Sequence, residues 1–79
     1  MYEWLKETLV NRLMLPEGAV TADASPETVG LDSLAVTELA MIAQEQWAVV
    51  VDEDEIAACA TIGDVAALIE RRRQQPAAR

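Results

Sequence analysis

Apolar residues recur at helical spacing in four stretches of the chain, and turn-forming or polar residues separate these stretches. The first covers about residues 2–14 and predicts an amphipathic helix, which Pro16 and Gly18 end. Residues 15–32, rich in Pro, Gly, Ser, Thr and Asp, then predict a long loop, and loops of that length are usually functional. The apolar stripe of the first stretch consists of Leu5, Leu9, Val10, Leu13 and Met14.

The second stretch begins at Asp32 or Ser33, because short oxygen-bearing side chains suit the N-cap of a helix. A helix to about Trp47 would bury one apolar face, formed by Val36, Leu39, Ala40, Ala43 and Trp47. Its opposite face carries Ser33, Thr37, Glu38, Met41, Gln44 and Glu45, with Ile42 beside them. The outward face is therefore unusually apolar at Met41 and Ile42.

The last two helices follow a connecting segment at residues 49–51, whose three valines have no partner strand elsewhere in the chain. Four acids at 52–55 open a short helix to about Ala58, where the helix dipole favours negative charge. Thr61 with Asp64 resembles a capping box and starts a final helix, which carries Ile62, Val65, Ala66, Leu68 and Ile69. We expect an all-α domain over 1–73, a bundle of four helices with a long first loop and a short third helix, and a disordered tail over 74–79.

Composition narrows the function of this single 79-residue domain. The chain has no His and one Cys, which excludes His-based catalytic triads, His metal ligands, an internal disulfide and Cys-based zinc sites. Its formal net charge is −8, and all basic residues except Lys6 and Arg12 lie after residue 70. Such a surface repels nucleic acid and anionic membranes and attracts basic partner surfaces. With no secretory signal and no apolar run of membrane-spanning length, we expect a cytoplasmic protein. We also expect a monomer that is not an enzyme and holds no metal ion.

The stretch Gly30-Leu31-Asp32-Ser33-Leu34 opens the second helix, and here the sequence resembles the acyl carrier protein family. The resemblance continues through Glu38-Leu39, the acidic start of the third helix and the Thr61–Val65 start of the last. It implies a phosphopantetheine arm, transferred from coenzyme A to Ser33 by a Mg-dependent phosphopantetheinyl transferase. The arm's thiol would hold acyl groups as thioesters.

The residues around Ser33 suit this role on physical grounds. A helix N-terminus offers unpaired backbone N–H groups and a positive dipole, both of which favour a phosphodiester. Asp32 would help to hold the serine and the metal of the transferase, and Leu34 would offer an apolar contact. The alternative is that Ser33 is an ordinary helix cap, as most Asp-Ser pairs before a helix are. A nucleophile elbow is excluded, because there is neither a G-x-S-x-G motif nor a His.

In the family, the outward face of the second helix docks onto basic patches of the transferase, ketosynthase and acyltransferase. The corresponding residues here are Thr37, Glu38, Met41, Ile42 and Glu45, with Glu53 and Glu55 as a second patch. Ala35, Gln44 and Gln46 stand where acids are common in fatty-acid carriers, which favours a dedicated partner. The alternative for Met41 and Ile42 is that they are ordinary apolar residues scattered on the surface. The alternative for the acids at 52–55 is that they form a solvated helix start.

We therefore expect an acyl carrier of a polyketide or related specialised pathway. The rivals are a fatty-acid carrier, a peptidyl carrier and, from another class, an unmodified acidic helical adaptor. A sheltered chain would lie between the second and third helices, near Leu39, Ala40, Ala43, Ile56, Ala57 and Ile62. Cys59, Trp4 and Trp47 are interpreted as packing residues rather than as ligands.

Overall fold

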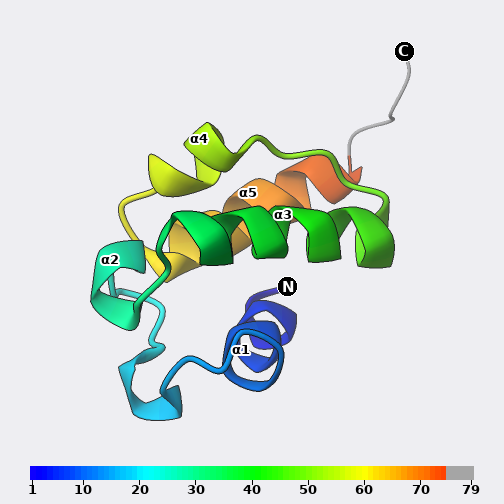
Figure 1. The fold of residues 1–79 in the computed structure, drawn as a ribbon. Coiled ribbons are helices and arrows are strands. Elements are labelled where there is room, and N and C mark those ends of the chain that lie inside the picture. The colour runs from blue at the N-terminus through cyan, green and yellow to red at the C-terminus, as the bar shows by residue number, and fades with distance from the viewer. Residues whose placement is uncertain (75–79) are drawn as a thin grey trace.

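The computed structural model describes residues 1–74, which form helices joined by loops. In chain order the elements are α1 (Tyr2–Asn11), the 3-10 turn η1 (Glu17–Ala19), α2 (Pro26–Val29), α3 (Ser33–Trp47), α4 (Glu53–Ala57) and α5 (Ile62–Gln74). Helix α1 crosses beneath α3 and α5, and α4 lies above them (Figure 1). The predicted all-α class is confirmed.

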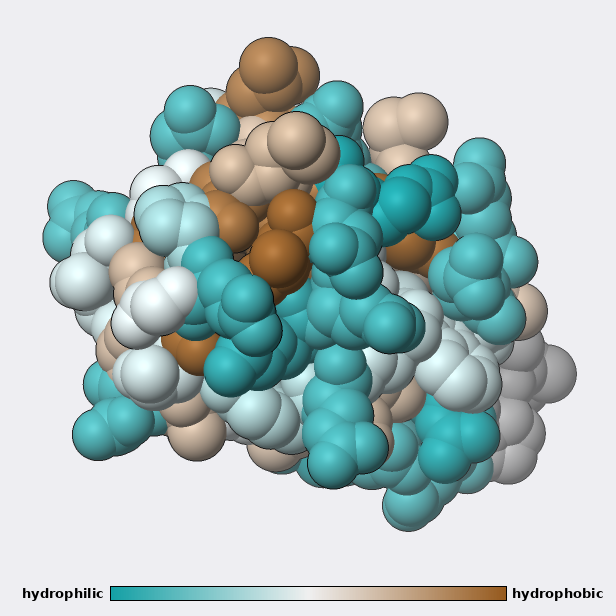
Figure 2. Space-filling view, turned by 90° about the horizontal axis from the view of Figure 1, so that it is seen from below, coloured by the Kyte–Doolittle hydropathy of each residue, from teal (hydrophilic) through white to brown (hydrophobic). Residues whose placement is uncertain are grey.

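One apolar core lies between these helices. Leu39 of α3, Ile56 of α4 and Ile69 of α5 are all fully buried and belong to it. The predicted stripe of the first helix is confirmed at Leu5 and Leu9, whose side chains are fully buried too. Figure 2 shows the side on which α1 lies: hydrophilic side chains dominate it, and brown apolar atoms emerge only in small areas. The remaining fully buried side chains of the core include Val20, Val29, Ile62 and Val65.

The first helix ends earlier than the apolar spacing predicts. It stops at Asn11, and Met14 adopts a left-handed backbone conformation with its side chain 80% exposed. The chain turns back here, so that the N–H of Leu15 donates to the carbonyl of Leu9 at 2.9 Å. Pro16 disfavours helical geometry at the residue before it, so the helix must end upstream of the proline rather than at it.

The predicted long loop contains one more short helix, α2, so residues 1–74 hold five α-helices instead of four. Its ends carry standard signals that the loop prediction overlooked. Ser25 caps the start by accepting from the N–H of Thr28 at 3.2 Å, and Pro26 occupies the first helical position. Gly30 ends the helix with φ at 90°, in the left-handed region that favours glycine.

The same loop also provides hydrogen-bond acceptors for the first amides of α5. The N–H groups of Ile62 and Gly63 donate to the carbonyls of Ala24 and Ala22, each at 2.8 Å. The N–H of Asp64 donates to Thr61 Oγ1 at 3.1 Å, which is the serine or threonine half of the expected capping box. Backbone donors that a helix start leaves unpaired are thereby satisfied, and the loop is fixed against the bundle.

Helix α5 includes one residue that the sequence placed in the tail. Gln74, placed in the disordered tail by the sequence, is the last residue of α5 and donates from Nε2 to Glu70 Oε2 at 2.7 Å. The expected disorder of 75–79 lies outside the described residues. The valine segment 49–51 is a loop, as predicted, with Val49 and Val51 buried and Val50 exposed.

Candidate functional site

The start of α3 places Ser33 on the outside of the molecule. Asp32 is the N-cap, and its Oδ1 accepts from the N–H of Ala35 at 2.9 Å. Ser33 is the first helical residue and is exposed, while its carbonyl accepts from Thr37 Oγ1 at 3.0 Å. The N–H groups of Ser33 and Leu34 are among those that an α-helix leaves without an intrahelical acceptor. Asp32 therefore has the capping role, and Ser33 is exposed with no capping role of its own.

The turn from α2 into α3 fixes this geometry. The N–H of Leu31 donates to Pro26 O at 2.9 Å and that of Gly30 to Glu27 O at 3.1 Å, which is the pattern of a Schellman motif. Leu31 is buried next to it, as expected for an anchor. The direction in which the chain enters α3 thus depends on the positive φ of Gly30.

We predict that Gly30→Ala destabilises the fold by about 1 kcal/mol or more, because a Cβ is strained at its φ of 90°. Gly18→Ala is the matched control: Gly18 has no positive φ, and nothing lies within 4 Å of an added Cβ. We expect it to be neutral or to stabilise by about 0.4–1 kcal/mol. Urea unfolding followed by circular dichroism measures both, and equal stabilities of the two variants would contradict the role of Gly30.

An open depression of about 690 Å³ lies beside Ser33, between α2, the start of α3 and α4. Several of the side chains around it are acidic, among them Glu27, Glu53 and Asp54. It is lined by Ser25, Pro26, Glu27, Leu31, Asp32, Ser33, Val36, Glu53, Asp54, Ala57 and Cys59. The site therefore consists of the exposed Ser33 and, next to it, a depression lined by both acidic and apolar side chains.

The predicted shelter between the second and third helices is only partly correct. Of the residues expected around it, Ala57 borders the depression. Ala40 borders a separate opening of about 490 Å³ next to the start of α4. The other four are fully buried in the protein interior: they are Leu39, Ala43, Ile56 and Ile62.

The outward face of α3 carries most of the residues predicted to dock partners. Leu34 is 69% and Met41 58% exposed, so two large apolar side chains of α3 are accessible to solvent. Glu38 and Glu45 are exposed on the same helix, and Thr37 is half-buried. We refer to Leu34, Thr37, Glu38, Met41 and Glu45 as the outward face of α3.

Ile42 is not part of this face, because it is buried rather than exposed as the sequence predicted. Only 7% of the residue is exposed. Each helical residue is rotated by about 100° from the one before it, so Ile42 turns from the side of Met41 towards α1. There it lines a small cavity of about 270 Å³ together with Trp4 and Thr8 of α1.

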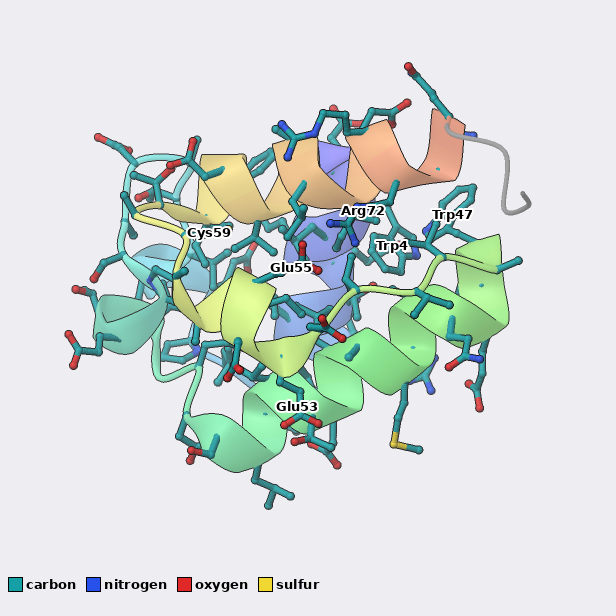
Figure 3. All side chains as sticks on the ribbon, turned by 90° about the horizontal axis from the view of Figure 1, so that it is seen from above. Trp4, Trp47, Glu53, Glu55, Cys59 and Arg72 are labelled. Carbon is teal, nitrogen blue, oxygen red and sulfur yellow. The ribbon has the colours of Figure 1, made fainter. Side chains whose placement is uncertain are left out.

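Of the two acids expected to form a second docking patch, Glu53 is exposed, whereas Glu55 is engaged within the fold. Both carboxylate oxygens of Glu55 accept from the guanidinium of Arg72, and Oε1 also accepts from the N–H of Asp52 at 3.0 Å. Figure 3 shows Arg72 reaching from α5 towards Glu55 on α4. The hydrogen bonds from Arg72, and then that from Asp52, hold the pKa of Glu55 below its ordinary value.

This arrangement predicts that acid destabilises the protein. Glu70 also has a lowered pKa, because Arg73 and Gln74 donate to its carboxylate. A carboxyl with a lower pKa in the folded state contributes stability at pH above its unfolded value and loses it as the pH falls through the folded value. Thermal unfolding from about pH 6 down to about pH 3 should therefore show a falling midpoint. Arg72→Met should reduce this dependence more than Arg71→Met does; identical profiles would contradict the role of the pair.

The expected packing residues Trp4, Trp47 and Cys59 do pack within the fold. The rings of Trp4 and Trp47 meet edge to face, with centroids 5.6 Å apart, and the Arg73 guanidinium lies 5.0 Å from the Trp47 ring centroid. Cys59 is half-buried, and its Sγ donates to Glu55 O at 3.3 Å. Burial, and then the charge of Asp64, raises the pKa of the Cys59 thiol, which is unfavourable for a nucleophile.

Comparison with known proteins shows the family to which the chain belongs. The family model described as the phosphopantetheine attachment site matches residues 3–69, which is most of the chain. The chain belongs to the acyl carrier protein family. It is 34% identical over 71 residues to the acyl carrier protein of Sulfurovum sp., covering 89% of this chain and 95% of that one.

Two further relatives agree with this assignment. The acyl carrier protein of Wolinella succinogenes is 32% identical over 74 residues, covering 92% of this chain and 97% of that one. The chloroplastic acyl carrier protein 1 of Casuarina glauca is 38% identical over 61 residues, covering 76% of this chain and 45% of that one. Members of the acyl carrier protein family are carriers, generally non-catalytic, that interact with phosphopantetheinyl transferases and acyl-processing enzymes.

A covalently attached phosphopantetheine is the prosthetic group of this acyl carrier protein family member, and the start of α3 fits such a group. The Ser33 hydroxyl is exposed, and the adjacent N–H groups and the positive end of the helix dipole favour a phosphodiester. The depression beside it provides room for an extended chain. When attached, the group supplies a thiol that holds acyl chains as thioesters.

Two further findings concern metal binding and membrane spanning. Within residues 1–74, no group of three or more His, Cys, Asp and Glu side chains is arranged to hold a metal ion. None of the helices in the same part of the chain has the length and apolar character needed to cross a bilayer.

Proposed function

We propose that this protein carries acyl intermediates on a phosphopantetheine arm attached to Ser33. The observation that supports Ser33 most directly is its placement: it is the exposed first residue of a 15-residue helix, and Asp32 performs the capping that would otherwise occupy a serine hydroxyl. In the transfer, Ser33 Oγ forms the new ester bond to phosphorus and gives up its proton. Coenzyme A provides the phosphopantetheine and leaves as adenosine 3′,5′-bisphosphate.

The chain offers a sharp test of this position. It contains two serines, Ser25 and Ser33. A protease that cuts after Glu separates them by cutting after Glu27, and its cut after Glu38 ends the fragment that contains Ser33. Incubation with coenzyme A, Mg²⁺ and a broad-specificity phosphopantetheinyl transferase should add one phosphopantetheine to the intact mass. We expect the addition in the fragment 28–38, on Ser33 rather than on Thr28 or Thr37. No addition with several transferases would contradict the proposal and favour an unmodified adaptor.

We further propose that the acyl intermediates belong to a polyketide or related specialised pathway. Two residues of α3 support this, since Gln44 and Gln46 are exposed where fatty-acid carriers commonly have acids. Gln46 lies beside Ile42 at the edge towards α1 rather than on the outward face. Ala35, which the sequence placed in the same argument, is only 8% exposed and so provides no support. A face with fewer acids attracts the basic patch of a fatty-acid enzyme less strongly.

The pathway is tested with the modified protein and the malonyl transferase and ketosynthase of a fatty-acid synthase. We expect slow use of the wild type and a gain of roughly tenfold in the Gln44→Glu, Gln46→Glu double variant, through faster association at low salt. Ala67→Glu adds one acid at an exposed position of another helix, α5, and serves as the control. Efficient use of the wild type by both enzymes would instead identify a fatty-acid carrier.

We propose that the outward face of α3 and the exposed Glu53 form the surface that partner enzymes contact. Leu34 and Met41 provide the apolar contact, and Glu38, Glu45 and Glu53 provide charges that attract a basic partner. Ile42 and Glu55 are left out of this surface because one is buried and the other pairs with Arg72.

A further inference from the structure

Helix α4 is short and buries few of its side chains. It has five residues, Glu53–Ala57, which is far below the length at which an isolated helix is stable in water. Ile56 is its one fully buried side chain. Contacts made by the rest of the helix must therefore decide how firmly it is held.

A single side chain of α5 provides such a contact. Arg72 donates from Nη1 to Glu55 Oε1 at 3.0 Å and to Val50 O at 3.1 Å, and from Nη2 to Glu55 Oε2. It thus holds α4 and also the loop that leads into it, as Figure 3 shows for Arg72 and Glu55. We call these contacts the Arg72 link. A forked, charge-assisted pair that also binds a carbonyl is among the surface interactions with a measurable effect.

The same helix forms one wall of the depression beside Ser33. Glu53, Asp54 and Ala57 line it from α4, with Cys59 just beyond, while Ser33 and Val36 line it from α3. Glu55 and Ile56 lie between these lining residues in the sequence, on the side of α4 that faces the interior and α5. Movement of α4 would therefore change the width of the depression.

We propose that Arg72 is a positioning residue, which holds α4 in place through the Arg72 link and so sets the opening of the depression next to Ser33. The effect on α4 is a property of the unmodified protein. The consequence for a tethered acyl chain rests on the proposed function, because it requires that the chain is attached at Ser33. A narrow depression would shelter the first part of such a chain and its thioester from water.

The first experiment is hydrogen exchange of the unmodified protein. The amides of Glu55, Ile56 and Ala58 donate within α4 and report its opening. Arg72→Met should speed their exchange at least about tenfold, as the loss of a charged hydrogen-bonded pair does when it lowers a local opening energy. Amides in the middle of α3 should be unchanged. Arg71→Met removes the same charge from the exposed neighbouring position and is the control.

Two more variants separate the link from general loss of stability. Arg72→Lys keeps the charge but not the fork, so exchange in α4 should lie between wild type and Arg72→Met. Glu55→Gln should speed exchange in α4 much as Arg72→Met does, and the double variant should be no faster than either single one. Equal exchange in Arg72→Met and Arg71→Met, or additive effects of the two changes, would overturn the proposal.

The second experiment uses protein loaded with acetyl or octanoyl phosphopantetheine, and measures thioester hydrolysis. We expect the ratio of octanoyl to acetyl hydrolysis to rise about threefold or more in Arg72→Met as the open population grows, with no change in Arg71→Met. An unchanged ratio despite faster exchange in α4 would overturn the effect on the chain. If Ser33 accepts no phosphopantetheine in any variant, the proposed function fails, and the exchange result still decides the position of α4.

Discussion

Replacement of Ser33 by alanine is expected to abolish phosphopantetheine attachment completely. The transfer requires an oxygen nucleophile, and Ser33 bears the hydroxyl that the fold presents at the exposed start of α3. The other serine is in a different situation. Ser25 Oγ accepts from the N–H of Thr28 and contacts Thr28 Oγ1 at 2.7 Å, so its oxygen serves as a cap. Ser25→Ala should therefore weaken α2 but still accept one phosphopantetheine.

The Ser33→Ala result can be interpreted because the substitution spares the fold. Ser33 is exposed, Asp32 provides the side-chain cap, and alanine is the best helix former, so stability should change by no more than about 0.5 kcal/mol. Intact mass and circular dichroism are measured on both serine variants and on the wild type. A phosphopantetheine on a folded Ser33→Ala protein would mean that another hydroxyl, that of Ser25 or of a threonine, is the acceptor and would overturn the assignment.

Local signals were sufficient where a single helix buries a single face. Leu39 and Ala43 of α3, and Val65 and Ile69 of α5, follow the 3.6-residue period and are buried as that period predicts. The site was equally predictable, since the Asp32 cap and Ser33 depend on a few adjacent residues and on the family resemblance. The family assignment is confirmed, whereas the role of Ser33 stays a proposal.

Contacts between distant parts of the chain account for what the sequence did not predict. Ile42 lies at the edge of the buried face of α3, and only the crossing of α1 beneath α3 decides that it is covered. Glu55 was expected to face partners, but its partner Arg72 is 17 residues away in the sequence. No spacing rule connects two such residues. By contrast, Ser25, Pro26 and Gly30 were visible signals of α2 that the prediction of one long loop missed.

The second large effect concerns the core, where Leu39→Ala should destabilise the protein by about 2–5 kcal/mol. Leu39 is fully buried in the middle of α3 and belongs to the one core shared by α1, α3, α4 and α5. Truncation removes apolar area from the core and leaves a cavity that fixed neighbours cannot fill. For a domain of this size the loss is a large part of a total of about 5–10 kcal/mol.

Met41→Ala on the same helix is the control for this change. Met41 also loses a long apolar side chain, but it is 58% exposed, so its loss should change stability by no more than about 0.5 kcal/mol. Urea unfolding followed by circular dichroism should therefore shift strongly for Leu39→Ala and hardly for Met41→Ala. Since Met41 belongs to the outward face of α3 and Leu39 does not, modification kinetics under folding conditions should show the reverse order. A strongly destabilised Met41→Ala would mean that this face is packed rather than free for a partner enzyme.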